Sequence, residues 1–334
     1  MLAEKPRDII VNEKCCVLIA FKDRLGSLLV CLERLLPQLS ATQHLFLVDD
    51  GSREDITQNS LFKNYLDNPS IFITQHNENR GVSAARNTGV RWALDNDYDI
   101  LIMTDSDCLI SDSFIDDHLK AHRKYPKIPM VCGAVKGKGH TLWARLDNLM
   151  TWFHCFPGTP EGIIPHPYIA PTANISLKIR MLPFKLDFFN ESLRTGEDTA
   201  FSRMIRNAGF SIVFSPSPEI GHHDRNRFGE FIKHQYEFGR HHYVILHLDF
   251  HIGQIYLHPM YRFLFVPAFF LVLPFYSVLG SALNIIPWMR HDSSNVIYWP
   301  LMQLVWLLKG VGVLESACFP RRVFRDNKLS STLK

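Results

Sequence analysis

Short apolar runs alternate with amphipathic stretches along the first third of the chain. The runs of strand length are residues 16–21, 44–48, 70–74 and 100–103, and the amphipathic stretches are residues 25–39 and 82–94. Strands that alternate with helices in this way are typical of a mainly parallel sheet with helices on both faces. The pattern therefore predicts an α/β fold built on a Rossmann-like sheet.

The pattern is less regular in the middle of the chain. Residues 133–171 mix glycine, proline and aromatic side chains without clear periodicity, so the sequence predicts no particular element there. Regular structure is expected to resume at residues 173–177. Residues 199–208 then have the spacing of a helix, which Gly209 is expected to end.

Two long apolar stretches near the C-terminus change the picture. Residues 263–288 contain no charged side chain, and residues 296–314 form a second stretch that only Lys309 interrupts. About 20 apolar residues are enough to cross a bilayer. Two membrane spans or a re-entrant hairpin are favoured over a buried or monotopic helical pair. The arginine-rich tail after Phe319 is expected to stay in the cytoplasm, which leaves the N-terminal part on that same side.

Composition, net charge and cysteine spacing exclude several classes of protein. Hydrophobic residues make up 46 % of the chain and charged residues 21 %, which is typical of a folded protein and excludes a disordered one. A net charge of +3 is too small to indicate nucleic-acid binding. The seven cysteines have no CxxC spacing, and the N-terminus lacks the apolar core of a secretory signal. These features favour a reducing compartment.

Acidic residues follow two of the predicted strands. Asp49 and Asp50 come after the second strand, and Asp105, Ser106 and Asp107 come after the fourth. In such sheets the ligand crevice lies beyond the carboxyl ends of the strands. Carboxylate oxygens are the ligands that hard divalent cations prefer. Either cluster alone is equally explained as a polar turn, but two on one rim favour a site for a metal-bound diphosphate.

Two further segments carry candidate chemistry at predicted helix starts. Residues 79–89 combine glycine with small side chains, which lets a phosphate approach the helix start closely. Arg86 would then lie in the first turns of this helix. The alternative is a plain helix start that Ser83 caps. Asp198 follows Thr195 as in a capping box. We expect the helix dipole to keep the Asp198 carboxylate ionised at neutral pH, which suits a general base.

These motifs, in this order, resemble those of the family 2 glycosyltransferases, which have the GT-A fold. The resemblance covers about residues 15–242. It rests on residues 19–24, Asp49-Asp50-Gly51-Ser52, the pattern from Asn79 to Gly89, Asp105-x-Asp107, Asn174, and Gly196-Glu197-Asp198.

The resemblance implies a role for each donor-side position. Asp50 would recognise the nucleotide base, and the backbone around Phe21 and the side chain of Arg24 would line the same pocket. Arg86 would lie near the nucleotide. The remaining donor contacts would come from Asp105 and Ser106.

The resemblance also implies the groups around the reacting atoms. Asp107 would ligate a divalent cation, Mg²⁺ or Mn²⁺, and His222 would approach the same metal-bound diphosphate, although one histidine among 16 carries little weight alone. Asp198 would be the base in a direct displacement with inversion. Asn174 and Glu197 would lie in the acceptor region.

Two departures from the family pattern matter. Residues 20–23 read Ala-Phe-Lys-Asp where Pro-Thr-Tyr-Asn is usual, which leaves the base that is read open. The Gln-x-x-Arg-Trp motif of processive members is replaced between Gln235 and Arg240 by a segment without tryptophan. We therefore expect transfer of a single sugar.

Together these inferences predict an inverting glycosyltransferase at the cytoplasmic face of the cell membrane. Residues 1–250 would form the GT-A catalytic domain, and residues 251–334 a membrane-associated helical hairpin with a basic tail. The donor would be a nucleotide-diphosphate sugar, with a UDP-sugar favoured, and the acceptor a glycan or a lipid-linked sugar. The alternatives are a catalytically silent membrane-tethered binding protein and a sugar-phosphate nucleotidyltransferase; the latter needs a glycine-rich basic loop after the first strand, where residues 21–26 offer none.

Overall fold

The structure is a computed structural model that describes residues 13–54, 56–166, 168–183, 188–193, 195–249 and 258–320. The basic tail predicted after Phe319 falls in residues 321–334 and lies outside the described residues, as does the domain boundary predicted at residue 250.

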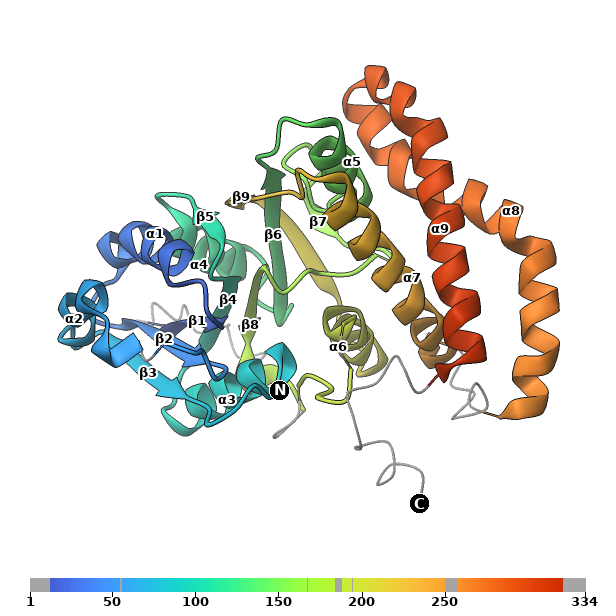
Figure 1. The fold of residues 1–334 in the computed structure, drawn as a ribbon. Coiled ribbons are helices and arrows are strands. Elements are labelled where there is room, and N and C mark those ends of the chain that lie inside the picture. Colours follow the sequence, from blue (N-terminus) through green and yellow to red (C-terminus); the bar gives the residue numbers. More distant parts are fainter. Residues whose placement is uncertain are drawn as a thin grey trace, which may run out of the picture.

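A single sheet forms the centre of the molecule (Figure 1). Within the described residues it has nine strands, with the order β3-β2-β1-β4-β8-β6-β9-β5 and with β7 paired to β9. The strands are β1 (Cys15–Phe21), β2 (Gln43–Asp49), β3 (Ile71–Gln75), β4 (Ile100–Asp105), β5 (Cys108–Ile110), β6 (Met130–Gly137), β7 (Gly162–Ile163), β8 (Asn174–Lys178) and β9 (Ile212–His222). The predicted α/β class with a Rossmann-like sheet is confirmed.

Strand direction divides the sheet into two parts. The four strands predicted from apolar runs, β1 to β4, are all parallel to their neighbours. Beyond them, β8 runs antiparallel to both β4 and β6, and β9 is parallel to β6 but antiparallel to β5 and β7. The sheet is therefore parallel in its first half and mixed in its second, where the expectation of a mainly parallel sheet does not hold.

Helices cover both faces of the sheet, with α1 and α4 on one face and α3 on the other (Figure 1). The longer helices are α1 (Leu25–Leu35), α2 (Ser60–Leu66), α3 (Val82–Asp95), α4 (Phe114–Lys124), α5 (Leu142–Thr151), α6 (Glu197–Asn207), α7 (Phe228–Asp249), α8 (Pro259–His291) and α9 (Trp299–Cys318). Gly89 allows α3 to lie directly on β1, because a Cβ at this position would stand 2.2 Å from the side chain of Leu18. The predicted helices at 82–94 and 199–208 are confirmed as α3 and α6, and Gly209 follows α6 with a φ of +85°.

The C-terminal helices α8 and α9 form a hairpin that lies along the rest of the molecule. Near the hairpin turn, the ring of Trp288 stacks on Phe156 with centroids 3.8 Å apart and donates a hydrogen bond to the carbonyl of Leu149 at 3.2 Å. Near the start of α8, Phe265 packs against Tyr243 of α7 with centroids 5.1 Å apart. Both ends of the hairpin therefore contact the sheet-bearing part of the chain.

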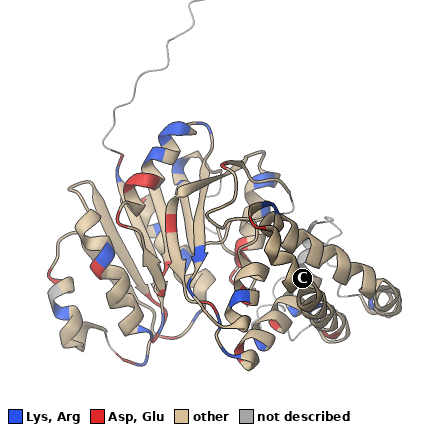
Figure 2. Ribbon diagram, turned by 90° about the horizontal axis from the view of Figure 1, so that it is seen from above, with Lys and Arg blue, Asp and Glu red and all other residues tan. Residues whose placement is uncertain are grey.

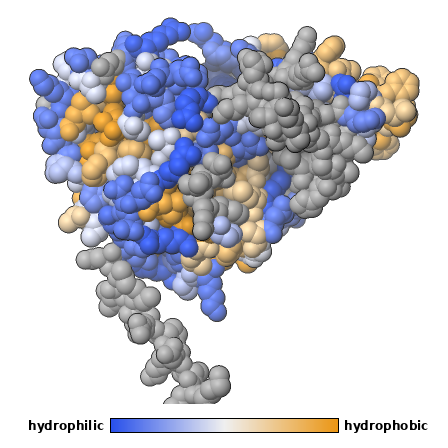
Figure 3. All heavy atoms as spheres, turned by 90° about the horizontal axis from the view of Figure 1, so that it is seen from below, coloured by the Kyte–Doolittle hydropathy of each residue, from blue (hydrophilic) through white to orange (hydrophobic). Residues whose placement is uncertain are grey.

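The outer side of the hairpin is strongly apolar. By length and composition, α8 and the segment Ser293–Cys318 are each apolar enough to cross a membrane. Figure 2 shows the hairpin with few charged residues, and its apolar surface reaches the right edge of Figure 3. The most exposed of its large apolar side chains are Phe263, Phe270, Leu271, Phe275 and Ile297.

Candidate active site

The loops after β2 and β3 are held together by short polar contacts. The Asp50 carboxylate is buried and accepts hydrogen bonds from the backbone N–H groups of Arg80 at 2.9 Å and Gly81 at 2.6 Å, and it lies 2.9 Å from Nδ1 of His76. Gly81 has a φ of +94° and directly precedes α3. Asp50 therefore fixes the start of α3, and base recognition by Asp50 stays a prediction.

Phe21 and Arg24 bring the first loop against the fourth strand. Phe21 is buried, and its carbonyl accepts a hydrogen bond from the N–H of Asp50 at 2.9 Å. The exposed guanidinium of Arg24 forms an ion pair with Asp107, which follows β4. The side chain predicted to line the nucleotide pocket thus contacts the one predicted to ligate the metal.

Arg86 connects three of the sequence motifs. Its side chain is 6 % exposed and lies between two carboxylates, with Nη2 2.9 Å from Oδ1 of Asp105 and Nη1 2.8 Å from Oε1 of Glu197. Burial lowers the pKa of Arg86, but the two carboxylates more than compensate and the pKa is raised overall. The structure therefore places the helix α3 motif, the end of β4 and the start of α6 around one fixed positive charge.

Asp198 is the second residue of α6, directly after Glu197. Burial raises the pKa of this carboxyl, and the charges of Glu197 and Asp105 raise it further. The charge of Arg86 and a hydrogen bond from the N–H of Thr199 at 2.8 Å lower it. The resulting pKa is about 7. The expectation that this carboxylate is fully ionised at neutral pH is therefore wrong. The helix dipole is outweighed by desolvation and by two neighbouring acids.

The predicted capping box at α6 is also absent. Gly196 occupies the N-cap position with a φ of +82° and makes no side-chain cap, and the hydroxyl of Thr195 is buried without a hydrogen-bond partner. The positive φ explains why glycine stands here, since other residues rarely adopt it. Asp198 is thus not required as a capping partner.

Asp107 and His222 meet at the same edge of the sheet. In the β5–β9 register Cys108 is opposite His222, so Asp107 is one residue from the position facing this histidine. Nδ1 of His222 is buried and makes no hydrogen bond. Within the described residues no three or more His, Cys, Asp or Glu side chains are grouped to hold a metal. Ser106, between Asp105 and Asp107, is buried.

Asn174 joins three strands of the sheet. Its side chain is fully buried, with Nδ2 donating to the carbonyls of Ala134 at 2.8 Å and Pro218 at 2.9 Å. Its Oδ1 lies 2.9 Å from Nε2 of His118. The side chain thus links β8 to β6 and β9, and a place for Asn174 in the acceptor region stays a prediction.

Several residues at the site were not predicted from the sequence. Glu191 contacts Arg80 at 3.3 Å and Asn87 at 3.1 Å, and Asn87 also exchanges two hydrogen bonds with the backbone of Phe189. His76 joins Asp50 to the hydroxyl of Thr88. Asn87 stands in the α3 motif and could have been found there. Glu191 is 104 residues from Asn87, and no local pattern marks it.

Comparisons with known proteins agree on one family. The sequence model of the family described as Glycosyl transferase family 2 matches residues 16–208, more than half of the chain. An uncharacterized glycosyltransferase from Rickettsia felis is 26 % identical over 202 residues, which cover 58 % of this chain and 30 % of that protein. The uncharacterized glycosyltransferase YfnE from Bacillus subtilis is 39 % identical over 87 residues, which cover 26 % of this chain and 21 % of that protein. The chain thus matches less than a third of the length of these relatives.

The fold has a counterpart among solved structures. The mannosyltransferase PcManGT from Pyrobaculum calidifontis, solved in complex with GDP-Man and Mn²⁺, superposes with a TM-score of 0.58 at 13 % identity. The superposition covers 95 % of this chain and 92 % of that one. Because it leaves out so few residues, it includes most of the α8–α9 hairpin. The likeness supports a GT-A fold with the C-terminal helices included.

Proposed function

Because the chain belongs to glycosyl transferase family 2, we propose that it transfers one sugar from a nucleotide-diphosphate sugar to an acceptor hydroxyl, with inversion at the anomeric carbon. The observation that carries this proposal is the position of Arg86, which holds Asp105 and Glu197 within 2.9 Å of its guanidinium beside Asp198. This arrangement supports a donor site and a base that lie close together.

The nucleotide would lie beyond the carboxyl ends of β1 to β4. A cavity of about 310 Å³ opens there, lined by residues 75–78 and Arg80, next to the loop that Asp50 fixes. Ligands of open α/β sheets bind at this edge. Phe21 and Arg24 border the same loops, and a UDP-sugar is the donor we propose to test first.

A divalent cation, Mg²⁺ or Mn²⁺, would be held by Asp107 and His222. The unpartnered buried Nδ1 of His222 beside the start of β5 fits such a ligand. Two protein ligands suit a cation whose remaining ligands are diphosphate oxygens and water. When bound, the cation supplies positive charge that stabilises the departing diphosphate.

The chemical step needs a base beside the acceptor. The acceptor oxygen forms a bond to the anomeric carbon as the bond from that carbon to the diphosphate oxygen breaks, and the diphosphate leaves with the electron pair. The Asp198 carboxylate takes the proton of the acceptor hydroxyl. A pKa of about 7 is favourable for this task, because a base is most effective when its pKa is near the working pH.

Membrane attachment would occur through the outer face of the hairpin. The turn of the hairpin contacts α5 through Trp288 and its start contacts α7 through Phe265. A hairpin that crossed the bilayer would carry its turn away from the catalytic domain and would lose these contacts. We therefore propose that α8 and α9 lie in the membrane surface, at the cytoplasmic face, where the basic tail after Phe319 would meet anionic lipids.

The direct test is a screen of nucleotide-diphosphate sugars with the purified chain in detergent or nanodiscs. We expect one donor to be hydrolysed or transferred with Mn²⁺ or Mg²⁺ but not with a chelator, and Asp198→Asn to lose turnover while keeping donor binding. If no donor responds to metal, or if Asp198→Asn turns over at the wild-type rate, the proposed function is wrong.

A further inference from the structure

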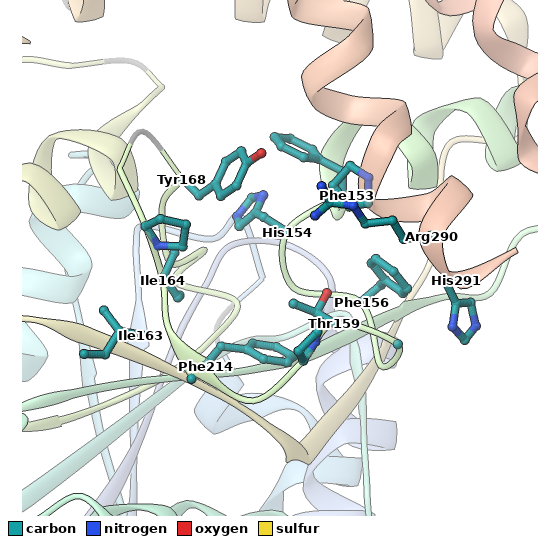
Figure 4. A pocket seen from close by; sticks show the side chains of 15 residues that line it. Phe153, His154, Phe156, Thr159, Ile163, Ile164, Tyr168, Phe214, Arg290 and His291 are labelled. Atoms are coloured by element: carbon teal, nitrogen blue, oxygen red, sulfur yellow. The ribbon is translucent and has the colours of Figure 1, made fainter. Parts of the chain in front are cut away.

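A second cavity lies away from the predicted donor site. It has a volume of about 400 Å³ and is lined by most residues of 153–165, by Tyr168 and Phe214, and by the end of α8 (Figure 4). Most of this wall comes from the stretch for which the sequence predicted no structure. Its composition is therefore the first information about what that stretch does.

The cavity walls are mainly apolar, but they also carry polar groups. His154 is 8 % exposed, and the backbone of Ile169 is a hydrogen-bond partner for its ring, which leaves one ring nitrogen without a partner. The buried hydroxyl of Thr159 also lacks a partner. Buried polar atoms are nearly always paired in folded proteins, so these two groups in one cavity wall suit a ligand that pairs them.

A positive charge stands at the polar end. Arg290, at the end of α8, has no ion pair or hydrogen bond to the described residues, and in Figure 4 its guanidinium points towards His154 and Tyr168. The opposite end of the cavity is formed by Phe214 and Ile164. The cavity is thus suited to a ligand with an anionic head and an aliphatic body.

The cavity adjoins both the membrane-facing helix and α6, the helix that carries the proposed base. Pro287 and Arg290 of α8 line it, and the neighbouring Ile286 is exposed on the outer apolar side of that helix. On the inner side, Arg206 of α6 donates a hydrogen bond at 3.2 Å to the carbonyl of Ile164, which lines the cavity.

We propose that this cavity binds the phosphate-bearing end of a membrane lipid that carries the acceptor, with Arg290, His154 and Thr159 around the phosphate and the chain on the apolar wall. The proposal rests on the proposed function and names its acceptor class. The phosphate would belong to a lipid, because a free phosphate ion has no apolar part that could pack against the apolar half of the cavity.

The test measures binding without any donor. Dioctanoyl phosphatidic acid, kept below its critical micelle concentration, is titrated into the purified chain while the total tryptophan fluorescence is followed. Two of the six tryptophans, Trp152 and Trp288, lie beside the cavity wall. We expect saturable binding that Arg290→Gln weakens about ten-fold or more, since a charge-assisted contact to phosphate is lost. Thr159→Trp, which fills the cavity from its partly exposed rim, should abolish binding.

Controls separate the two halves of the ligand. Lys63→Gln removes the same charge from an exposed position on α2, at the other end of the molecule (Figure 1), and should bind like the wild type. Equal binding of neutral dioctanoylglycerol, equal binding of inorganic phosphate alone, or unchanged binding in Arg290→Gln would each overturn the proposal.

The same variants distinguish this proposal from the proposed function. Lipid binding that depends on Arg290, in a chain that transfers no sugar, would overturn the proposed function alone. Sugar transfer with an unchanged KM for a lipid-phosphate acceptor in Arg290→Gln would overturn the cavity assignment alone.

Discussion

Replacing Asp198 by asparagine should stabilise the protein while removing its activity. Folding raises the pKa of this carboxyl from its ordinary value of 3.8 to about 7, chiefly because it is desolvated. At neutral pH the folded state must hold a charge that it disfavours, or bind a proton that the unfolded chain does not hold. Asparagine has the shape of the protonated acid and keeps an oxygen for the N–H of Thr199.

The size and sign of the effect follow from linkage. One pKa unit corresponds to about 1.4 kcal/mol, so a rise of about three units corresponds to an upper bound of about 4 kcal/mol. Because the side chain is partly open to solvent, we expect about half of that. The penalty is complete above pH 7 and shrinks as the pH falls towards 4, where the carboxyl is protonated in both states.

The assay is thermal unfolding of the purified chain without donor or metal, at pH 8 and pH 5. We expect Asp198→Asn to melt about 3 °C above the wild type at pH 8, and by less than half of that difference at pH 5. Asp112→Asn is the control, because this carboxylate is 97 % exposed and its loss should leave the melting temperature nearly unchanged. A gain in Asp198→Asn that is absent at pH 8, or equal at both pH values, would refute the reasoning.

Three further predictions concern other residues of the site. Arg86→Met leaves Asp105 and Glu197 facing each other without a cation and should lower the free energy of unfolding by about 3–5 kcal/mol in urea titrations; a loss under about 1 kcal/mol would contradict it. Asn174→Ala removes three buried hydrogen bonds and should lower the free energy of unfolding by about 3 kcal/mol. Below the melting temperature, kcat and the KM for the acceptor should be unchanged; a raised KM for the acceptor would instead support a role of Asn174 in acceptor binding. His222→Ala should raise the Mn²⁺ concentration for half-maximal activity about ten-fold or more, while its exposed neighbour His223→Ala should not, and equal behaviour of the two would exclude His222 as a ligand.

The first half of the fold could be predicted because its strands are buried on both faces. Residues 16–21 and 44–48 are continuous apolar runs, which is what a central parallel strand covered by helices requires. The reversed direction of β8 leaves no such signal, because an apolar strand reads alike in both directions. The helix α5 was missed because its apolar side packs partly on α7 and α8, far along the chain.

The candidate site shows the same division between local and distant causes. The turn residues after β2 and β4 are adjacent in sequence to the strands that place them, so Asp50 and Asp105 could be found. The burial of Asn174 depends on its contacts with Ala134 and Pro218, 40 and 44 residues away. The pKa of Asp198 depends on Asp105 and on Arg86, and neither distance can be read from a motif.

The packing of the hairpin adds an argument to a question that hydropathy leaves open. Length and composition allow α8 to cross a bilayer. A spanning hairpin would need its turn and its start on opposite sides of the membrane, yet Phe156 stacks on Trp288 near the turn and Tyr243 packs on Phe265 near the start. These contacts at both ends favour our proposal that the hairpin lies parallel to the membrane surface. A hairpin in that position would bring Arg290, which lines the second cavity, to the depth of the lipid phosphates.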